Sequence, residues 1–491
     1  MRQVYNPYLP LNEYIPDCEP HVFGDRVYVY GSHDKEGGHT FCMLDYVCYS
    51  APVTDLTDWR YEGIIYRAAQ DPDYGTRNYM YAPDVVQGND GRYYLYYCMS
   101  GEYGHGGYHG PIQVAVCDTP AGTYNYLECV QHTDGTPMLD YVCFDPAVLN
   151  DDGVIRLYYG TQYPYEEDDD FAQNEEHIQN EMQMFNKSRE EILETKESVM
   201  GPIMVVLEDD MITVKEPAKH IIPYHTRGTS FEAHPFFEGS SMRKVGNTYY
   251  FIYSSWLNHE LCYATSSYPD REFTFGGTII SNGDIGLNDR RADERLNMTG
   301  TTHGSIEQIN GQWYVFYHRL THKSDYSRQG CAEKIEIAKD GHIEQVPVTS
   351  CGLNQGALLP QGTYPAVIAC NLTNGHMPHG SNKQYEEPFP HVTNKGEERY
   401  IDEIQNNTLI GYKYFAFTGS ATLQLKVKAK GAGSIAISQN LEGEPLATIA
   451  IPKSEEWTLV TTTVPFAKGV TPLYLRYYGE EDMSLLEIAF L

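Results

Sequence analysis

Four acidic residues and one histidine occupy the same place in a repeated pattern of the sequence. Asp17, Asp84, Asp145 and Glu238 stand at the start of four stretches in which apolar and aromatic residues alternate, and His303 stands before a fifth. A single acid before a strand usually caps a turn. Acids that converge from several strands repel one another, which raises the pKa of some while others stay ionised. A protonated and an ionised carboxyl group together can hydrolyse a glycosidic bond.

The first stretch offers two candidate acids. Residues 15–34 read IPDCEPHVFGDRVYVYGSHD, so Asp17 and Glu19 flank one cysteine just before an alternating run. A turn, a metal ion or a reaction could each require acids at the start of a strand. From these residues alone the choice stays open.

The five stretches share an apolar approach, a Gly/Asp/Asn turn and an aromatic-rich alternating run. They are HVFGDRVYVYGS (21–32), DVVQGNDGRYYLYYC (84–98), DPAVLNDDGVIRLYYG (145–160), SMRKVGNTYYFIYSS (241–255) and SIEQINGQWYVFYHR (305–319). Each predicts a β-hairpin, because N-G and D-G turns between alternating runs are strong hairpin signals. The copies are roughly 65 residues apart, enough for about four short strands, so the sequence predicts a five-bladed β-propeller.

Two further regions differ from this pattern. The gap between the third and fourth copies is about 30 residues longer, and the acidic stretch at about 166–199, which lacks glycine and proline until its end, predicts a helical insert. Beyond residue 350, short alternating runs such as TLQLKVKA and WTLVTTTV predict an antiparallel, jelly-roll-like β-sandwich. We therefore expect an all-β protein with a propeller at 1–350 and a sandwich at 351–491.

Composition excludes several classes of partner. The 491 residues carry 35 basic and 67 acidic side chains, a formal net charge of -32, which repels nucleic acid and anionic membrane surfaces and is compatible with a neutral substrate. The 11 cysteines include no C-x-x-C pair, so we expect free thiols rather than a zinc site. With no apolar leader and no apolar run long enough to span a bilayer, a cytoplasmic location is expected.

Several of these motifs together resemble family 43 of the glycoside hydrolases. The resemblance runs from about residue 6 to 335 and rests on NPYLP, YGSHD, YAPDVV, FDPAVLNDDG, FFEGSSMRKVGNTYYFIYS and HGSIEQINGQWYVFYH. It implies a five-bladed propeller that cleaves xylan and arabinan fragments with inversion. The expected function is an exo-acting β-xylosidase or α-L-arabinofuranosidase that acts on oligosaccharides and needs no organic cofactor.

The resemblance also implies roles for individual acids. Glu238 in FEGS matches the general acid, and Asp145 in FDPAV matches the aspartate that raises the acid's pKa and orients it. The general base of the family usually stands in an Asp-Pro pair, whereas this sequence reads D-C-E-P. Counting back from Tyr28, the family spacing reaches Asp17, with Glu19 as the second candidate.

The remaining assignments rest on the same resemblance. Asp34, Asp84 and Arg328 resemble residues that line the sugar pocket, and His303 resembles a histidine that binds calcium or another ion in the propeller channel. The C-terminal part resembles family 6 carbohydrate-binding modules. The alternatives are a carbohydrate-binding propeller without catalysis and an endo-acting xylanase or arabinanase. The choice between xylose and arabinose, and the oligomeric state, stay open.

Overall fold

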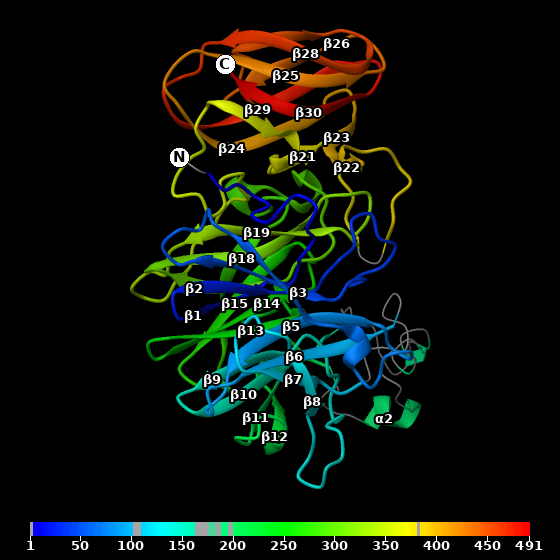
Figure 1. Cartoon of the computed structure of the whole chain (residues 1–491), viewed down its shortest axis with the longest axis vertical. Coiled ribbons are helices and arrows are strands. Elements are labelled where there is room, and N and C mark those ends of the chain that lie inside the picture. The colour runs from blue at the N-terminus through cyan, green and yellow to red at the C-terminus, as the bar shows by residue number, and fades with distance from the viewer. Residues whose placement is uncertain are drawn as a thin grey trace.

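Strands dominate the structure, as predicted. The computed structural model describes residues 3–101, 110–162, 188–194, 200–380 and 383–491, together with residues 175, 178, 179 and 182. Most of the predicted helical insert at about 166–199 lies outside the described residues, and within it α2 (Arg189–Glu194) is the helix with defined bounds. No helix in the described part of the chain is long and apolar enough to cross a membrane. The all-β class is confirmed (Figure 1).

Five antiparallel sheets follow one another along the first two thirds of the chain, each with its strands in sequence order. The first sheet contains β1 (Glu19–Phe23), β2 (Arg26–Tyr30), β3 (Tyr46–Pro52) and β4 (Arg60–Tyr66). The second contains β5 (Tyr79–Gln87), β6 (Tyr93–Ser100), β7 (Gln113–Cys117) and β8 (Asn125–Cys129). The third contains β9 (Ala147–Asp151), β10 (Val154–Tyr159), β11 (Ile203–Leu207) and β12 (Val214–His220). The fourth contains β13 (Phe236–Val245), β14 (Thr248–Ser255), β15 (Glu260–Ser266) and β16 (Thr274–Ser281). The fifth contains β17 (Ser305–Ile309), β18 (Gln312–Leu320) and β19 (Arg328–Ile335).

The five predicted hairpins are the first two strands of these sheets. Two of their turns have the backbone geometry that the sequence indicated: Asp152 and Gly153 have φ of 52° and 93°, and Asn310 and Gly311 have φ of 50° and 83°. Two consecutive positive φ angles define the turn that matches the twist of a hairpin, and Asn, Asp and Gly adopt them with little strain.

The first strands of the five sheets form a closed ring. β1 lies beside β5, β5 beside β9, β9 beside β13, β13 beside β17, and β17 beside β1. A parallel bridge between Cys18 and Gly304 joins the first sheet to the last. Sheets arranged around a closed ring of inner strands form a five-bladed propeller. The residues that precede or begin these inner strands are therefore brought together around one axis.

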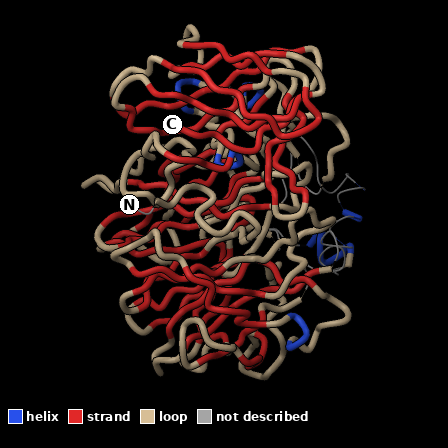
Figure 2. Tube along the Cα trace, turned by 45° about the horizontal axis from the view of Figure 1, so that its top comes forward, coloured by secondary structure: helices blue, strands red, loops and turns tan. Residues whose placement is uncertain are grey.

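Two further antiparallel sheets follow the propeller. One contains β20 (Gly362–Pro365), β22 (His391–Lys395), β23 (Glu398–Ile404), β25 (Ala421–Ala429), β28 (Ser454–Val464) and β30 (Met483–Phe490). The other contains β21 (Asn371–Thr373), β24 (Leu409–Phe417), β26 (Gly433–Ser438), β27 (Ala447–Ile451) and β29 (Gly469–Gly479). Buried residues from both sheets, among them Leu425, Ile437 and Ile488, belong to one hydrophobic core. Figure 2 shows the strands of both regions stacked along the molecule.

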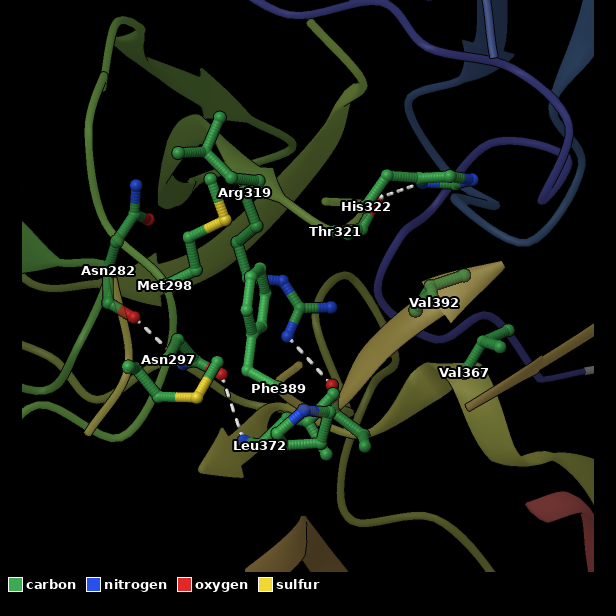
Figure 3. Close-up of a pocket in the computed structure, with 14 residues that line it drawn as sticks. Asn282, Asn297, Met298, Arg319, Thr321, His322, Val367, Leu372, Phe389 and Val392 are labelled. Atoms are coloured by element: carbon green, nitrogen blue, oxygen red, sulfur yellow. Dashed lines mark hydrogen bonds between the residues drawn. The ribbon is translucent and has the colours of Figure 1, made fainter. Parts of the chain in front are cut away.

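The C-terminal sheets meet the propeller along its fifth blade (Figure 3). Arg319 of β18 donates from Nη1 to the carbonyl of Ala369 at 3.0 Å, and the amide of Leu372 donates to Asn297 Oδ1 at 3.0 Å. The cavity between them measures about 30 Å³, room for one or two waters but not for a sugar ring. None of the predicted acids lines it, so the junction is structural and the candidate site lies elsewhere.

Candidate active site

Asp17 lies directly before β1, buried and tightly bonded. Arg328 donates from Nη1 to both carboxylate oxygens of Asp17, at 2.9 and 3.1 Å, and His318 Nδ1 lies 3.3 Å from Asp17 Oδ1. Burial alone would raise the pKa of Asp17, but the charge of Arg328 and the contacts of His318 and His303 hold it well below its usual range. Asp17 is therefore ionised at neutral pH.

Arg328, the first residue of β19, is itself fixed from the other side. It donates from Nε to Asp34 Oδ2 at 2.8 Å and from Nη2 to Asp34 Oδ1 at 3.0 Å. Such a two-bond pair sets the plane of the guanidinium group as well as its position. The guanidinium carbon also lies 4.6 Å from the centre of the Phe41 ring. Asp34 and Arg328, which the sequence placed in the sugar pocket, thus hold Asp17.

Asp145 occupies the corresponding place before β9. Its Oδ2 accepts a hydrogen bond from the Gly239 amide at 3.2 Å and lies 3.6 Å from His303 Nδ1, while that nitrogen is 3.7 Å from Asp17 Oδ1. His303 therefore stands between the two aspartates, and burial lowers its pKa to about 4, so it is neutral at pH 7. Asp145 is tied to the backbone of the residue that follows Glu238.

Glu238 lies in β13 at a bulge, where the register with β14 shifts on both sides of it. Gly239 has φ of 76°, and a Cβ there would approach the His303 ring to 3.1 Å, so both the backbone conformation and the space favour glycine. Glu238 is only partly buried, whereas Asp17 and Asp145 are each 3% exposed. Of the three residues, Glu238 is the most exposed to solvent.

The surroundings of Asp17 and Glu238 give their carboxyl groups different pKa values. Burial and the negative charge of Asp17 raise the pKa of Glu238 to about 8. Burial and repulsion from Glu238 raise the pKa of Asp145 well above its usual range. Glu238 is thus protonated at neutral pH while Asp17 is ionised, which is the division of roles that general acid and base catalysis requires.

Both buried aspartates have backbone conformations that L-residues seldom adopt. Asp17 has φ of 57° and Asp145 has φ of 46°. Aspartate and asparagine tolerate this region better than other side chains with a Cβ, and such residues cluster at functional sites. Both carboxylates lie within 3.7 Å of His303 Nδ1.

A second group of polar side chains lies two residues further along the inner strands. Glu19 Oε2 accepts a bond from Arg243 Nη2 at 2.8 Å, and His21 Nε2 lies 2.6 Å from Asp84 Oδ1. The ligand atoms of Glu19, His21 and Asp84 lie within 4.8 Å of one another. Glu19 Oε1 is buried without a hydrogen-bond partner among the described residues. The structure thus places Asp84 and Glu19 together, and in the described part of the chain neither side chain is hydrogen-bonded to Asp17, Asp145 or Glu238.

Sequence reasoning overlooked three residues of the site. His318 is the last residue of the quoted motif HGSIEQINGQWYVFYH, and its imidazole in a strand of mostly apolar residues was the available signal. Phe41 and Arg243 gave no local signal, because their partners Arg328 and Glu19 are 287 and 224 residues away in sequence.

Comparison with known proteins identifies relatives along the whole chain. The family model described as "Glycosyl hydrolases family 43" matches residues 11–343. A curated protein named xylosidase/arabinosidase, from Thermoclostridium stercorarium, is 42% identical over 500 residues, which cover 99% of this chain and 98% of that protein.

Solved structures agree with this match. A GH43_1 enzyme from Xanthomonas citri complexed with xylotriose is 26% identical, with a TM-score of 0.52 over 70% of this chain and 94% of that one. A family 43 β-xylosidase/α-arabinofuranosidase from a compost microbial metagenome, in complex with xylotriose in a calcium-free form, is 26% identical, with a TM-score of 0.51 over 69% of this chain and 96% of that one.

Proposed function

The chain belongs to glycosyl hydrolases family 43, and from this membership we propose that it is an inverting, exo-acting glycosidase that releases xylose or arabinose from short oligosaccharides. The observation that carries the proposal is the pair of ionised Asp17 and protonated Glu238, in which the charge of Asp17 helps to raise the pKa of Glu238. The relative that matches the full chain is named for the same two sugars.

In the proposed reaction each side chain has one task. Asp17 takes a proton from a water molecule as the water oxygen attacks the anomeric carbon. The glycosidic C–O bond breaks, and Glu238 gives its proton to the leaving oxygen. Asp145 keeps Glu238 in place through its bond to the Gly239 amide. Glu238 then recovers a proton from solvent, to which the residue is partly exposed, and Asp17 releases the proton it took from water, which restores both groups.

The test is a panel of xylo- and arabino-oligosaccharides with product analysis and NMR of the first anomer formed. Release of single pentoses from the chain end with inverted configuration supports the proposal. Retained configuration would contradict the inverting mechanism, because in a retaining enzyme one of the two carboxylates, and not water, attacks the sugar first. Internal cleavage products would identify an endo-acting enzyme, and binding without turnover would identify a carbohydrate-binding propeller.

The pKa of Glu238 predicts the pH dependence of this activity. Activity requires a proton on Glu238 and none on Asp17, so kcat/KM should be constant through neutral pH and fall about tenfold per pH unit above the Glu238 pKa of about 8. The acid limb should lie well below pH 4, because the pKa of Asp17 is held below its usual range. Initial rates between pH 4 and 10 should therefore show the alkaline limb and no acid limb, and an alkaline limb near pH 6 would contradict the assignment.

We further propose a calcium ion in the propeller channel. Calcium binds oxygen ligands, and the unpartnered Oε1 of Glu19 beside Asp84 fits that preference. The charge of Asp84 influences His303, so His303 would be a nitrogen ligand together with His21 of the same cluster, with water completing the shell. The ion would offset the negative charge of the second group of acids and steady the inner strands.

Removal of the proposed calcium ion should change both the activity and the stability of the protein. Prolonged chelation should lower both kcat and the melting temperature, and added calcium should restore them, because the ion would stabilise the native state that binds it. Calorimetric titration of the chelated protein with calcium gives a readout that does not depend on activity. Unchanged activity and no heat of binding would leave His303 as a structural residue.

The remaining parts of the proposal concern the domains and the location of the protein. We propose that residues 1–350 form the catalytic propeller and that residues 351–491 form a jelly-roll-like sandwich similar to family 6 carbohydrate-binding modules, in which the two C-terminal sheets enclose their shared core. All 11 cysteines are free, which is typical of proteins in the reducing cytoplasm. The partner is an oligosaccharide, and no organic cofactor enters the proposed reaction.

A further inference from the structure

The loop at residues 31–38 carries two acids that face different parts of the molecule. Asp34 holds Arg328, which in turn holds Asp17. Glu36, two residues later, pairs with Arg399 of the C-terminal strand β23. Arg399 donates from Nε to Glu36 Oε1 at 2.9 Å and from Nη2 to Glu36 Oε2 at 2.6 Å. Only 15% and 16% of the Arg399 and Glu36 side chains are exposed, so this two-bond pair is shielded from solvent.

Tyr14 connects the same loop to the segment that carries Asp17. Its hydroxyl donates to Glu36 Oε1 at 3.0 Å, and its carbonyl accepts a bond from the Asp34 amide at 2.9 Å. Tyr14 stands three residues before Asp17 and is 1% exposed. Glu36 therefore lies on the loop that carries Asp34 and is bonded to the segment that carries Asp17, and Arg399 reaches it from the C-terminal sheet.

The segment that precedes Arg328 is also fixed by the C-terminal region. The amide of Val392 donates to the Thr321 carbonyl at 2.8 Å, and that of Tyr385 donates to the Lys323 carbonyl at 2.9 Å. The Asp325 amide donates to the Lys383 carbonyl at 3.1 Å. Residues 321–325 thus run beside residues 383–392 over several hydrogen bonds before the chain enters β19 at Arg328.

Two independent contacts from the C-terminal region therefore converge on the support of one side chain. We call the Glu36–Arg399 pair and the pairing of residues 321–325 with 383–392 the clamp. The first contact holds the loop that carries Asp34, and the second holds the segment that leads to Arg328. These two residues fix the position of Asp17.

We propose that the C-terminal region positions the general base through the clamp, and that Arg399 is its principal positioning residue. This inference rests on the proposed function, in which Asp17 activates water. A carboxylate that shifts by about 1 Å from its reacting geometry loses about a hundredfold in rate. Because Asp17 acts on water rather than on a sugar hydroxyl, loss of the clamp should lower kcat and leave KM nearly unchanged.

The test uses full-length Arg399→Met, which keeps most of the apolar stem and removes the guanidinium group. Its kcat should fall about 10- to 100-fold with KM within about threefold, and Arg399→Lys should recover part of the loss because it restores the charge without the two parallel bonds. Arg476→Met is the matched control. Arg476 also lies in a C-terminal strand, but it bonds to Asn407 within that region, and this variant should keep full kcat.

Combination with Asp17→Asn separates positioning from a general loss of stability. On a nitrophenyl glycoside, Arg399→Met should change the residual rate of Asp17→Asn by less than about twofold, because the base through which it acts is already gone. An equal loss in both backgrounds, or full kcat in a folded Arg399→Met protein, would overturn the inference. Should Arg399→Met fail to fold, Glu36→Gln takes its place, and full kcat there would overturn it equally. A wild-type protein without glycosidase activity would count against the proposed function instead.

Discussion

Glu238→Gln should lower kcat/KM on xylo- or arabino-oligosaccharides by about 10²- to 10⁴-fold while nitrophenyl glycosides lose far less. A sugar alkoxide is a poor leaving group and must receive a proton as the bond breaks. A nitrophenolate departs with little protonation, so the missing acid hardly affects it. Paired measurements of kcat/KM on the two substrate classes give the difference directly.

The same variant offers an internal control through its pH profile. The glutamine side chain does not titrate, so the alkaline limb near the Glu238 pKa of about 8 should disappear from the residual rates on oligosaccharides, the substrates that need the acid. Equal losses on both substrate classes, or an alkaline limb that persists, would remove Glu238 from the role of general acid. Such a result would favour a residue that only binds the sugar.

Asp17→Asn should slow both substrate classes alike, by about 10²- to 10⁴-fold, because water must be activated whatever group leaves. Asparagine suits this test because it tolerates the φ of 57° at this position. It also keeps one oxygen that can accept a bond from Arg328, whose second acid partner, Asp34, remains. Initial rates, together with thermal unfolding to show that the fold is kept, measure the effect.

Glu19→Gln is the matched control for this prediction. Glu19 stands two residues from Asp17 and is paired with Arg243 in the second group of acids. Its neutralisation should lower the rates on both substrate classes far less than Asp17→Asn does, because glutamine keeps a side-chain oxygen that can still bind the proposed ion. If Glu19→Gln abolished turnover and Asp17→Asn kept it, the base would be Glu19 and the spacing counted from Tyr28 would have been misleading.

The propeller was predictable because its signals are local. Each hairpin is encoded within about 15 residues by alternation and by a turn such as Asp152-Gly153 or Asn310-Gly311. Five copies of one local pattern then imply the ring, and the ring implies that Asp17, Asp145 and Glu238 converge. Their grouping around His303 follows from position within the repeat.

The supports of these acids were not predictable in the same way. Asp34 and Arg328 are 294 residues apart, and Glu36 and Arg399 are 363 apart, so no local pattern links them. The sequence also did not indicate how far along its inner strand each acid lies. Asp17 and Glu19 differ by two residues, about 7 Å along an extended chain, and that step separates the group around Glu238 from the group around Asp84. Roles assigned to the individual carboxyl groups stay predictions until the variants are measured.

The closed ring of inner strands also bears on how the chain folds. Asp17 enters with the first blade, while Arg328 enters with the fifth, 311 residues later. One side of the first blade therefore lacks its neighbouring blade throughout synthesis. The ion pair between Asp17 and Arg328 cannot form until the last blade docks. Contacts of such long sequence separation slow folding and leave intermediates exposed to aggregation. During refolding, recovery of turnover should thus mark ring closure and lag behind recovery of β-structure, while a chain shortened before β19 would keep four blades and lack the guanidinium that fixes its base.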